Sequence, residues 1–199
     1  MKSILMIAAL FLAPVMGPTI SQAERDKAVT ELENSQKVFL DATRGLSEAQ
    51  WNFKPAPDRW SVAECAEHIG VTEEMIFKLV TEQALKGPAE PQKRELVKIQ
   101  DDQILTMALD RSQKFKAPES IQPTRRWSTP AEITRNVLEN RAITLAFVNT
   151  TDQDLRNHFL DHPIFKTMDT YQWIILTSAQ MRRHTAQILE VKADPNFPK

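Results

Sequence analysis

The sequence predicts an all-α protein: a four-helix bundle with a long crossover connection, carrying a short helix, between its second and third helices. Three observations favour this fold class. Four long stretches of the 199 residues carry apolar side chains at helical spacing. Only four glycines occur, and the apolar/polar alternation typical of strands is rare. One long proline-containing stretch separates the second and third helical patterns, and crossovers of that kind are known in bundles.

The first two helices are predicted from their apolar spacing and their end signals. The first should cover about residues 24–44, with Gly45 as its stop. Its apolar side chains are Val29, Leu32, Phe39 and Ala42. The second should start sharply at Ser61, because Ser61 and Glu64 have the spacing of a capping box, in which each side chain binds a free backbone amide. We expect the second helix to end before Gly87.

Residues 86–128 are interpreted as the crossover, with one weaker helical piece at about 94–109. The third helix should begin with Thr129 as N-cap and Pro130 in the first helical position, and it should reach about Thr150. The fourth should run from Thr167 or Asp169 to Lys192, before Pro195. No internal repeat appears, so a single domain is expected.

The first 23 residues are typical of a secretory signal peptide. Lys2 precedes the apolar run "ILMIAALFLAPVM", which is too short to span a bilayer, and a small-x-Ala site ends at Ala23. We therefore expect cleavage after Ala23, export to the periplasm or the medium, and a domain of residues 24–199 without a stable membrane span. An uncleaved membrane anchor is the alternative.

Charge and cysteine usage narrow the partners. The formal net charge is -1 and the chain has no dense block of Lys or Arg, which argues against a nucleic-acid partner. Cys65 is the single cysteine. In an oxidising compartment a lone thiol is tolerated best when it is buried, so we expect Cys65 in the core.

Two histidines are the first candidates for chemistry. His68 lies at the border of the apolar stripe of the second helix. On the fourth helix one continuous line becomes polar in its middle; it consists of Trp173, Thr177, Gln180, His184 and Ile188. That pattern favours a cavity wall at which His68 and His184 meet beside Gln180. The alternative is a pair of hydrogen-bonded core histidines.

Two blocks of the sequence resemble the DinB-like (YfiT-like) superfamily of four-helix-bundle proteins, to which metal-dependent activities have been attributed. The blocks are "AQWNFKPAPDRWSVAECAEHIGVTEE" and "HPIFKTMDTYQWIILTSAQMRRHTAQILEVKADPNFP". Within them, Trp60-Ser61 opens a helix that carries Glu67-His68, and Tyr171-Gln172-Trp173 leads into the segment around His184. The resemblance covers essentially residues 25–197.

The resemblance implies a divalent-metal site, usually occupied by nickel or zinc. Its ligands are one histidine of the second helix and an H-x-x-x-H pair of the last helix; His68 matches the first, His184 the last, and Gln180 stands at the middle position. An amide oxygen is a poorer ligand for these ions than imidazole, so the metal should be weakly bound or absent. Three outcomes stay open: an ion with Gln180 as a ligand, an ion on two histidines plus water or substrate, or no ion, with Gln180 hydrogen-bonded to a histidine.

The remaining polar and aromatic candidates have ordinary structural interpretations. His158 and His162 are expected in surface turns, although either could reach the mouth of the site. Three tryptophans are expected to fill the core at the bundle end or to line the pocket: Trp51, Trp60 and Trp173. Arg182 and Arg183 should interact favourably with the dipole of the last helix. Glu64 is expected to cap its helix, and Glu67 to face solvent or to bind a histidine.

The family implies enzymes that act as metal-dependent thiol transferases, isomerases or hydrolases, in which the ion makes a thiol or water nucleophilic. The thiols used by such relatives are cytoplasmic, which conflicts with export. The alternative is a non-catalytic binding module that has lost the metal, and a homodimer through a helix face is a third option. Phosphate loops, Ser-His-Asp patterns and nucleotide fingerprints are absent from the sequence, so the expected partner is a small molecule of unidentified class.

Overall fold

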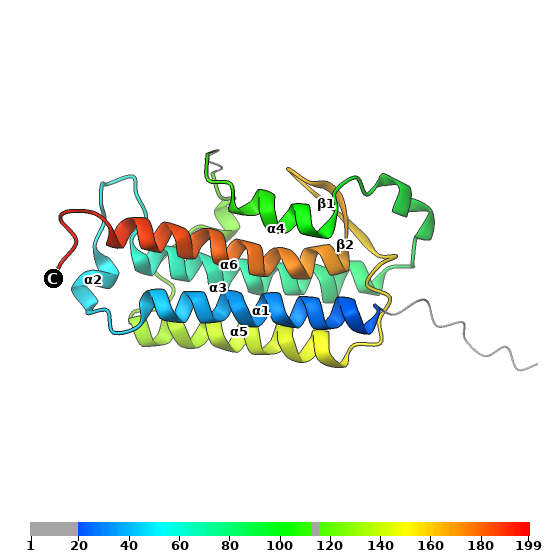
Figure 1. Cartoon of the computed structure of the whole chain (residues 1–199), viewed down its shortest axis with the longest axis horizontal. Coiled ribbons are helices and arrows are strands. Elements are labelled where there is room, and N and C mark those ends of the chain that lie inside the picture. The colour runs from blue at the N-terminus through cyan, green and yellow to red at the C-terminus, as the bar shows by residue number, and fades with distance from the viewer. Residues whose placement is uncertain (1–19, 113–115) are drawn as a thin grey trace, which may run out of the picture.

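The computed structural model describes residues 20–112 and 116–199 and confirms the four-helix bundle (Figure 1). Its long helices are α1 (Gln22–Thr43), α3 (Val62–Lys78), α5 (Pro130–Thr150) and α6 (Thr170–Lys192). Each of α1 and α3 packs against both α5 and α6. Helices that follow one another in sequence, α1 with α3 and α5 with α6, therefore lie diagonally across the bundle.

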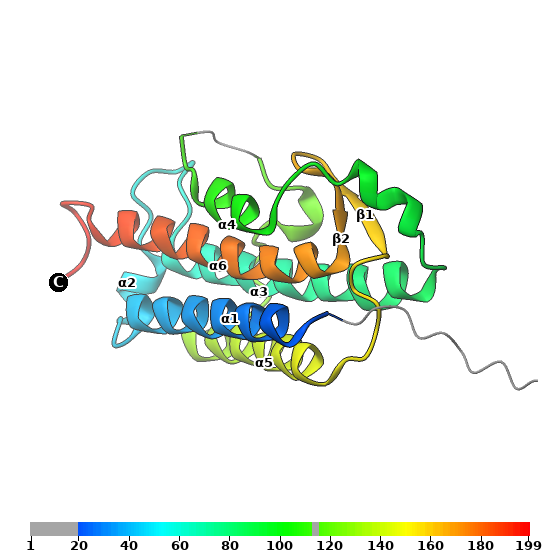
Figure 2. The ribbon, with the colours of Figure 1, turned by 45° about the vertical axis from the view of Figure 1, so that its right-hand side comes forward.

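Neighbouring helices α3 and α5 run in the same direction. The amide of Asn140 donates to the carbonyl of Gly70, and about two helical turns further along, Phe77 contacts Phe147. Residue numbers thus rise together along both helices. Parallel neighbours cannot be joined by a short loop, so the chain has to return along the bundle, as Figures 1 and 2 show.

The returning crossover contains more pieces than the sequence indicated. It comprises the π-helical turn η1 (Leu79–Gln83), the 3-10 turns η2 (Ala84–Lys86), η3 (Pro91–Leu96) and η4 (Glu119–Ile121), and helix α4 (Asp101–Leu109), which packs on α6. The α-helical part of the second helix ends at Lys78, short of Gly87. The helix predicted at 94–109 is divided, because Val97 and Gln100 adopt extended backbone angles and Gln103 then caps α4.

Capping residues fix the starts of the long helices. Ser61 with Glu64 and Thr129 with Glu132 form capping boxes, which confirms both predicted starts. At the first helix the box is Ser21 with Glu24, and Ile20 lies in the core. Residues 20–23 therefore contribute to the fold, whereas residues 1–19 of the predicted signal peptide lie outside the described part. Cleavage after Ala23 stays a prediction, and it would remove the Ser21 cap.

A short antiparallel hairpin, β1 (Phe159–His162) with β2 (Lys166–Asp169), precedes α6 and was not predicted. Each strand has only four residues, too few for a period of two to stand out. A short helix, α2 (Glu48–Asn52), follows α1. None of the helices in the described ranges is long and apolar enough to cross a membrane.

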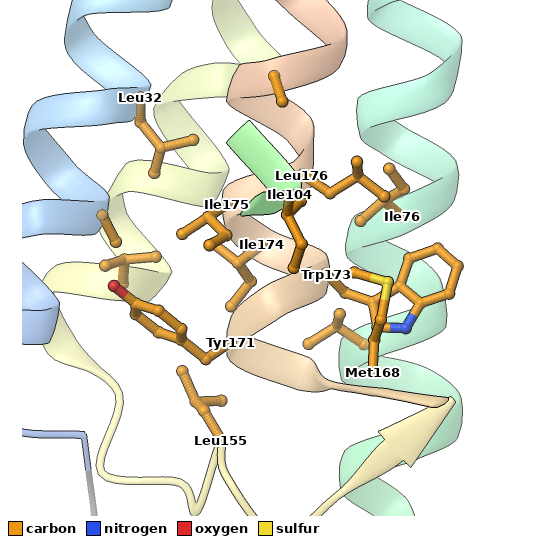
Figure 3. Packing of buried hydrophobic residues seen from close by; sticks show 14 of the residues in the cluster. Leu32, Ile76, Ile104, Leu155, Met168, Tyr171, Trp173, Ile174, Ile175 and Leu176 are labelled. Atoms are coloured by element: carbon orange, nitrogen blue, oxygen red, sulfur yellow. The ribbon is translucent and has the colours of Figure 1, made fainter. Parts of the chain in front are cut away.

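Two clusters of apolar side chains form the core. The first joins α6 to α1, α3, α4 and the hairpin (Figure 3), and Ile104 of α4 reaches into it. The second lies toward the other end of the bundle and contains Trp51 and Cys65. Cys65 is fully buried, as predicted, and burial raises the pKa of its thiol well above the usual range. This cysteine is an apolar core residue.

Candidate metal centre

His68 of α3 and His184 of α6 meet between their two antiparallel helices. Their ring centroids lie 4.3 Å apart and the ring planes are inclined by 70°. His68 is buried, whereas His184 is half-buried. The structure thus brings together the two imidazoles that the sequence pattern placed on inward helix faces.

Both rings are oriented through their Nδ1 atoms. Nδ1 of His68 lies 2.8 Å from the carbonyl oxygen of Ile121, and a carbonyl can only accept, so this nitrogen carries the proton. Nδ1 of His184 lies 3.1 Å from Oε1 of Gln187, where it donates in the same way. The Nε2 atom of each ring therefore keeps its lone pair. Anchoring one ring nitrogen on an oxygen is how proteins orient histidine ligands of metal ions.

Burial keeps both rings neutral. It lowers the pKa of His68, although the bond to Ile121 opposes that shift. It lowers the pKa of His184 further, and the neighbouring His68 adds to this effect. Neutral imidazole is the form that binds a metal ion, so at neutral pH protons compete little for either Nε2.

Trp60 covers the pair from the segment that precedes α3. Its ring centroid lies 4.9 Å from that of His68 and 5.8 Å from that of His184. Thr72 also contacts His68, with its hydroxyl 3.4 Å from Nε2. Trp60 thus lines the site, as the alternative prediction had it, and also packs against the second core cluster. Trp51 and Trp173 are core residues as expected.

Gln180 lies one turn before His184, but its amide does not stabilise the histidines. It is half-buried, and within the two described ranges no hydrogen bond joins its side chain to another residue. The option in which Gln180 binds His68 or His184 is therefore wrong for this structure, since Gln187 takes that place. The Gln180 oxygen is left available as a weak ligand.

The donor set fits a metal site of reduced strength. Among residues 20–112 and 116–199, no cluster of three or more His, Cys, Asp or Glu side chains could hold an ion. Two imidazoles on a tetrahedral zinc at about 2.0–2.1 Å have ring centroids about 5 Å apart. The rings here, at 4.3 Å, would have to separate by under about 1 Å. Two imidazoles with Gln180 or water as further donors therefore fit an ion, with lower affinity than three imidazoles.

Three charged residues near the site have roles that the sequence did not indicate. Arg182 forms an ion pair of 2.6 Å with Glu31 of α1, and Arg183 donates to the carbonyl of Asp110. Both contacts hold α6 to other elements, and the helix-dipole role stays a prediction. Glu67 is buried and accepts hydrogen bonds from three backbone amides, so the prediction that it faces solvent or binds a histidine was wrong.

His162 is the last residue of β1, and His158 directly precedes that strand. His158 is buried and donates from Nδ1 to the carbonyl of Ala84, which corrects its placement in a surface turn. Nδ1 of His162 accepts the amides of Ile164 and Phe165 inside the hairpin turn. Burial lowers the pKa of His162 to about 4. Both rings stabilise local structure.

Sequence reasoning missed the groups that orient the two imidazoles. Gln187 could have been found, because it lies three residues after His184 on the same helix face. The Ile121 carbonyl carried no such signal, since it lies 53 residues from His68 in the sequence and belongs to the backbone.

Comparisons with known proteins support the four-helix-bundle fold and show the family of the chain. The sequence model of the DinB superfamily matches residues 31–188. The uncharacterised protein YuaE of Bacillus subtilis is 26% identical over 150 residues, which is 75% of this chain and 87% of YuaE. The solved structure of YfiT from Bacillus subtilis matches with a TM-score of 0.55 at 16% identity, covering 90% of this chain and 92% of that chain. YfiT is described as "a probable metal-dependent hydrolase with an unusual four-helix bundle topology".

Proposed function

Because this chain belongs to the DinB superfamily, we propose that it is a metal-dependent hydrolase of a small molecule, with His68 and His184 as the ligands of a divalent ion. One observation carries this proposal. Two neutral rings face each other at 4.3 Å, each with Nδ1 anchored on an oxygen and Nε2 left with its lone pair. A bound divalent ion supplies Lewis acidity that makes water nucleophilic near neutral pH.

The side chains around the pair have distinct roles in this proposal. His68 and His184 hold the ion through Nε2, and Gln187 keeps the His184 ring in the correct tautomer. Gln180 offers a weak oxygen donor from the preceding turn. Trp60 excludes bulk water from one side of the rings, so that a substrate has to approach from the half-buried side of His184.

Water is favoured over a thiol as the nucleophile. We propose that residues 1–23 direct export, which would separate the protein from the cytoplasmic thiols of the family's transferases. Water is present in every compartment. The description of YfiT as a metal-dependent hydrolase supports the same choice.

A non-catalytic binding module of the same fold is the second candidate. One observation favours it: the third ligand position holds Gln180, and the described residues provide no three-ligand cluster. In that case the neutral pair and Trp60 would bind a small molecule directly, with Nε2 accepting a hydrogen bond from it and with Trp60 stacking on it.

Calorimetric titration of the purified protein with zinc and nickel tests the proposal. We expect micromolar or tighter binding, because burial leaves both imidazoles unprotonated. His184→Ala should abolish it, whereas the matched control His162→Ala, in the hairpin, should leave it unchanged. Flat titrations of the unchanged protein would reject the metal and favour the binding module. Hydrolysis of small esters and amides that stops on chelation would then separate an enzyme from a metal-binding protein.

A further inference from the structure

Two consecutive residues of α3, Glu67 and His68, both bind the same piece of the crossover. His68 donates to the carbonyl of Ile121. Glu67 accepts from the backbone amides of residues 124–126. This segment follows η4 and belongs to no regular helix or strand. Its position against α3 is therefore set by contacts of this kind.

The amides of residues 124–126 form an anion-binding concavity that Glu67 occupies. Oε1 of Glu67 lies 2.8 Å from the Thr124 nitrogen and 3.2 Å from that of Arg126, and Oε2 lies 3.0 Å from that of Arg125. Successive amides converge in this way when one residue adopts a left-handed conformation. Arg125 does so, with φ of 61°.

A left-handed arginine is strained, and the carboxylate compensates for that strain. Side chains with a Cβ rarely adopt this backbone region, and such residues persist only where their surroundings hold them. Glu67 is 2% exposed, and hydrogen bonds to an ionised acceptor in a dry site are stronger than neutral ones. The conformation of residues 124–126 thus depends on a buried negative charge.

Ile121 is only three residues before this concavity, and its carbonyl is the group that holds the Nδ1 proton of His68. Without that acceptor, the proton could move to Nε2 and remove the lone pair of that nitrogen. The loop conformation and the tautomer of His68 are therefore linked through a short stretch of backbone.

We propose that Glu67 is a positioning residue of the metal site: by holding residues 124–126, it keeps the Ile121 carbonyl against His68 and so keeps Nε2 free to bind the ion. This inference deepens the proposed function and rests on it for the role of the metal. The link between Glu67 and the His68 tautomer is a property of the metal-free protein.

Glu67→Gln is the test, because a glutamine of the same size directs an NH2 group at amides that need an acceptor. Nitrogen NMR of the histidine rings, without metal, should show the Nδ1-protonated tautomer of His68 in the unchanged protein and a shift toward the Nε2-protonated tautomer in the variant. Zinc affinity measured by calorimetry should fall about tenfold or more, as it does when groups that orient ligands are removed.

Glu74→Gln is the matched control. It lies on the same helix and forms an ion pair of 2.6 Å with Lys78, whereas the amides of residues 124–126 bind Glu67. Both the tautomer of His68 and zinc affinity should be unchanged in this variant. If Glu67→Gln does not fold, Glu67→Asp, which keeps the charge on a shorter side chain, should give an intermediate tautomer shift.

The outcomes separate this inference from the proposed function. Zinc binding by the unchanged protein, with equal affinity and an unaltered His68 tautomer in the Glu67 variants, would overturn the role of Glu67 and leave the metal site intact. No zinc binding by the unchanged protein would reject the metal site. A tautomer shift in Glu67→Gln would then still show that this carboxylate controls the ring.

Discussion

Two polar pairs lie inside the same bundle and differ in how completely their atoms are bonded. The His68–His184 pair joins α3 to α6 and leaves Nε2 lone pairs without a backbone partner. The Arg141–Glu73 pair joins α5 to α3, with the Arg141 Nε atom 2.9 Å from Oε1 of Glu73. Arg141 is fully buried and Glu73 is 2% exposed.

Arg141 is surrounded by acceptors from every other long helix. On α1 it donates to the Leu32 carbonyl and to the Ser35 hydroxyl, each at 3.1 Å. On α6 it reaches the carbonyl of Thr177. One guanidinium of α5 therefore fixes the relative positions of all four helices.

The difference shows which buried polar group is structural and which is available for chemistry. A guanidinium whose donors are all hydrogen-bonded has no donor left for a ligand. Its burial is a structural feature, and the desolvation of its charge costs free energy. Two imidazoles that are anchored at one nitrogen and open at the other can bind an ion or a ligand.

Arg141→Leu should have the largest effect on stability. It leaves the Glu73 carboxylate buried without its counter-ion, and removing one partner of a buried pair costs about 3–5 kcal/mol. Urea denaturation measures this loss. The double variant Arg141→Met/Glu73→Leu should recover most of the stability, because it removes two charges whose desolvation costs free energy. Burial raises the pKa of Glu73 and lowers that of Arg141, and the ion pair opposes both shifts. A double variant as unstable as the single one would contradict this account.

Gln180→His should raise the zinc affinity of the site formed by His68 and His184. It places a third imidazole one turn before His184, at the position where the resemblance to the family predicts a ligand histidine. Zinc affinity measured by calorimetry should rise about tenfold or more, since imidazole is a better ligand than an amide oxygen for this ion. Gln83→His, at an exposed position of η1, is the control and should leave affinity unchanged. Equal affinity in both variants would show that position 180 does not face the ion.

Acidification should produce the smallest and most gradual loss of stability. Burial lowers the pKa of His68, His184 and His162 in the folded state, the last to about 4. As pH falls below about 6.5, the usual value for histidine, the unfolded chain takes up these protons first. Stability should therefore decrease from pH 6.5 toward pH 4 and be unaffected above pH 7.

Urea denaturation at several pH values measures this trend. His162→Gln should reduce the loss between pH 6.5 and pH 4, because one of the contributing groups is removed. Bound zinc should oppose the loss, since the ion stabilises the folded state and competes with protons for Nε2. A stability that rises on acidification through this range would contradict neutral, buried imidazoles.

The sequence by itself determined where the helices begin and which faces are buried. Ser61 with Glu64 and Thr129 with Pro130 are local signals, and local hydrogen bonds decide helix starts whatever the rest of the chain does. Cys65 was likewise predicted to be buried from its apolar neighbours. The inward placement of His68 and His184 followed from helical spacing, and the resemblance to a family gave the pair its expected role.

Only the tertiary structure decided which groups complete the site. Arg141 has the sequence context of an ordinary helical surface charge, yet it is the most enclosed cation of the described residues. Two parts of the site are backbone features: the amides that bind Glu67, and the carbonyl of Ile121. No pattern of side chains in the sequence predicts them. Their positions follow from the parallel course of α3 and α5, which sends the crossover back along the bundle. Contacts between residues so far apart in the chain arise from packing, because no local interaction brings them together.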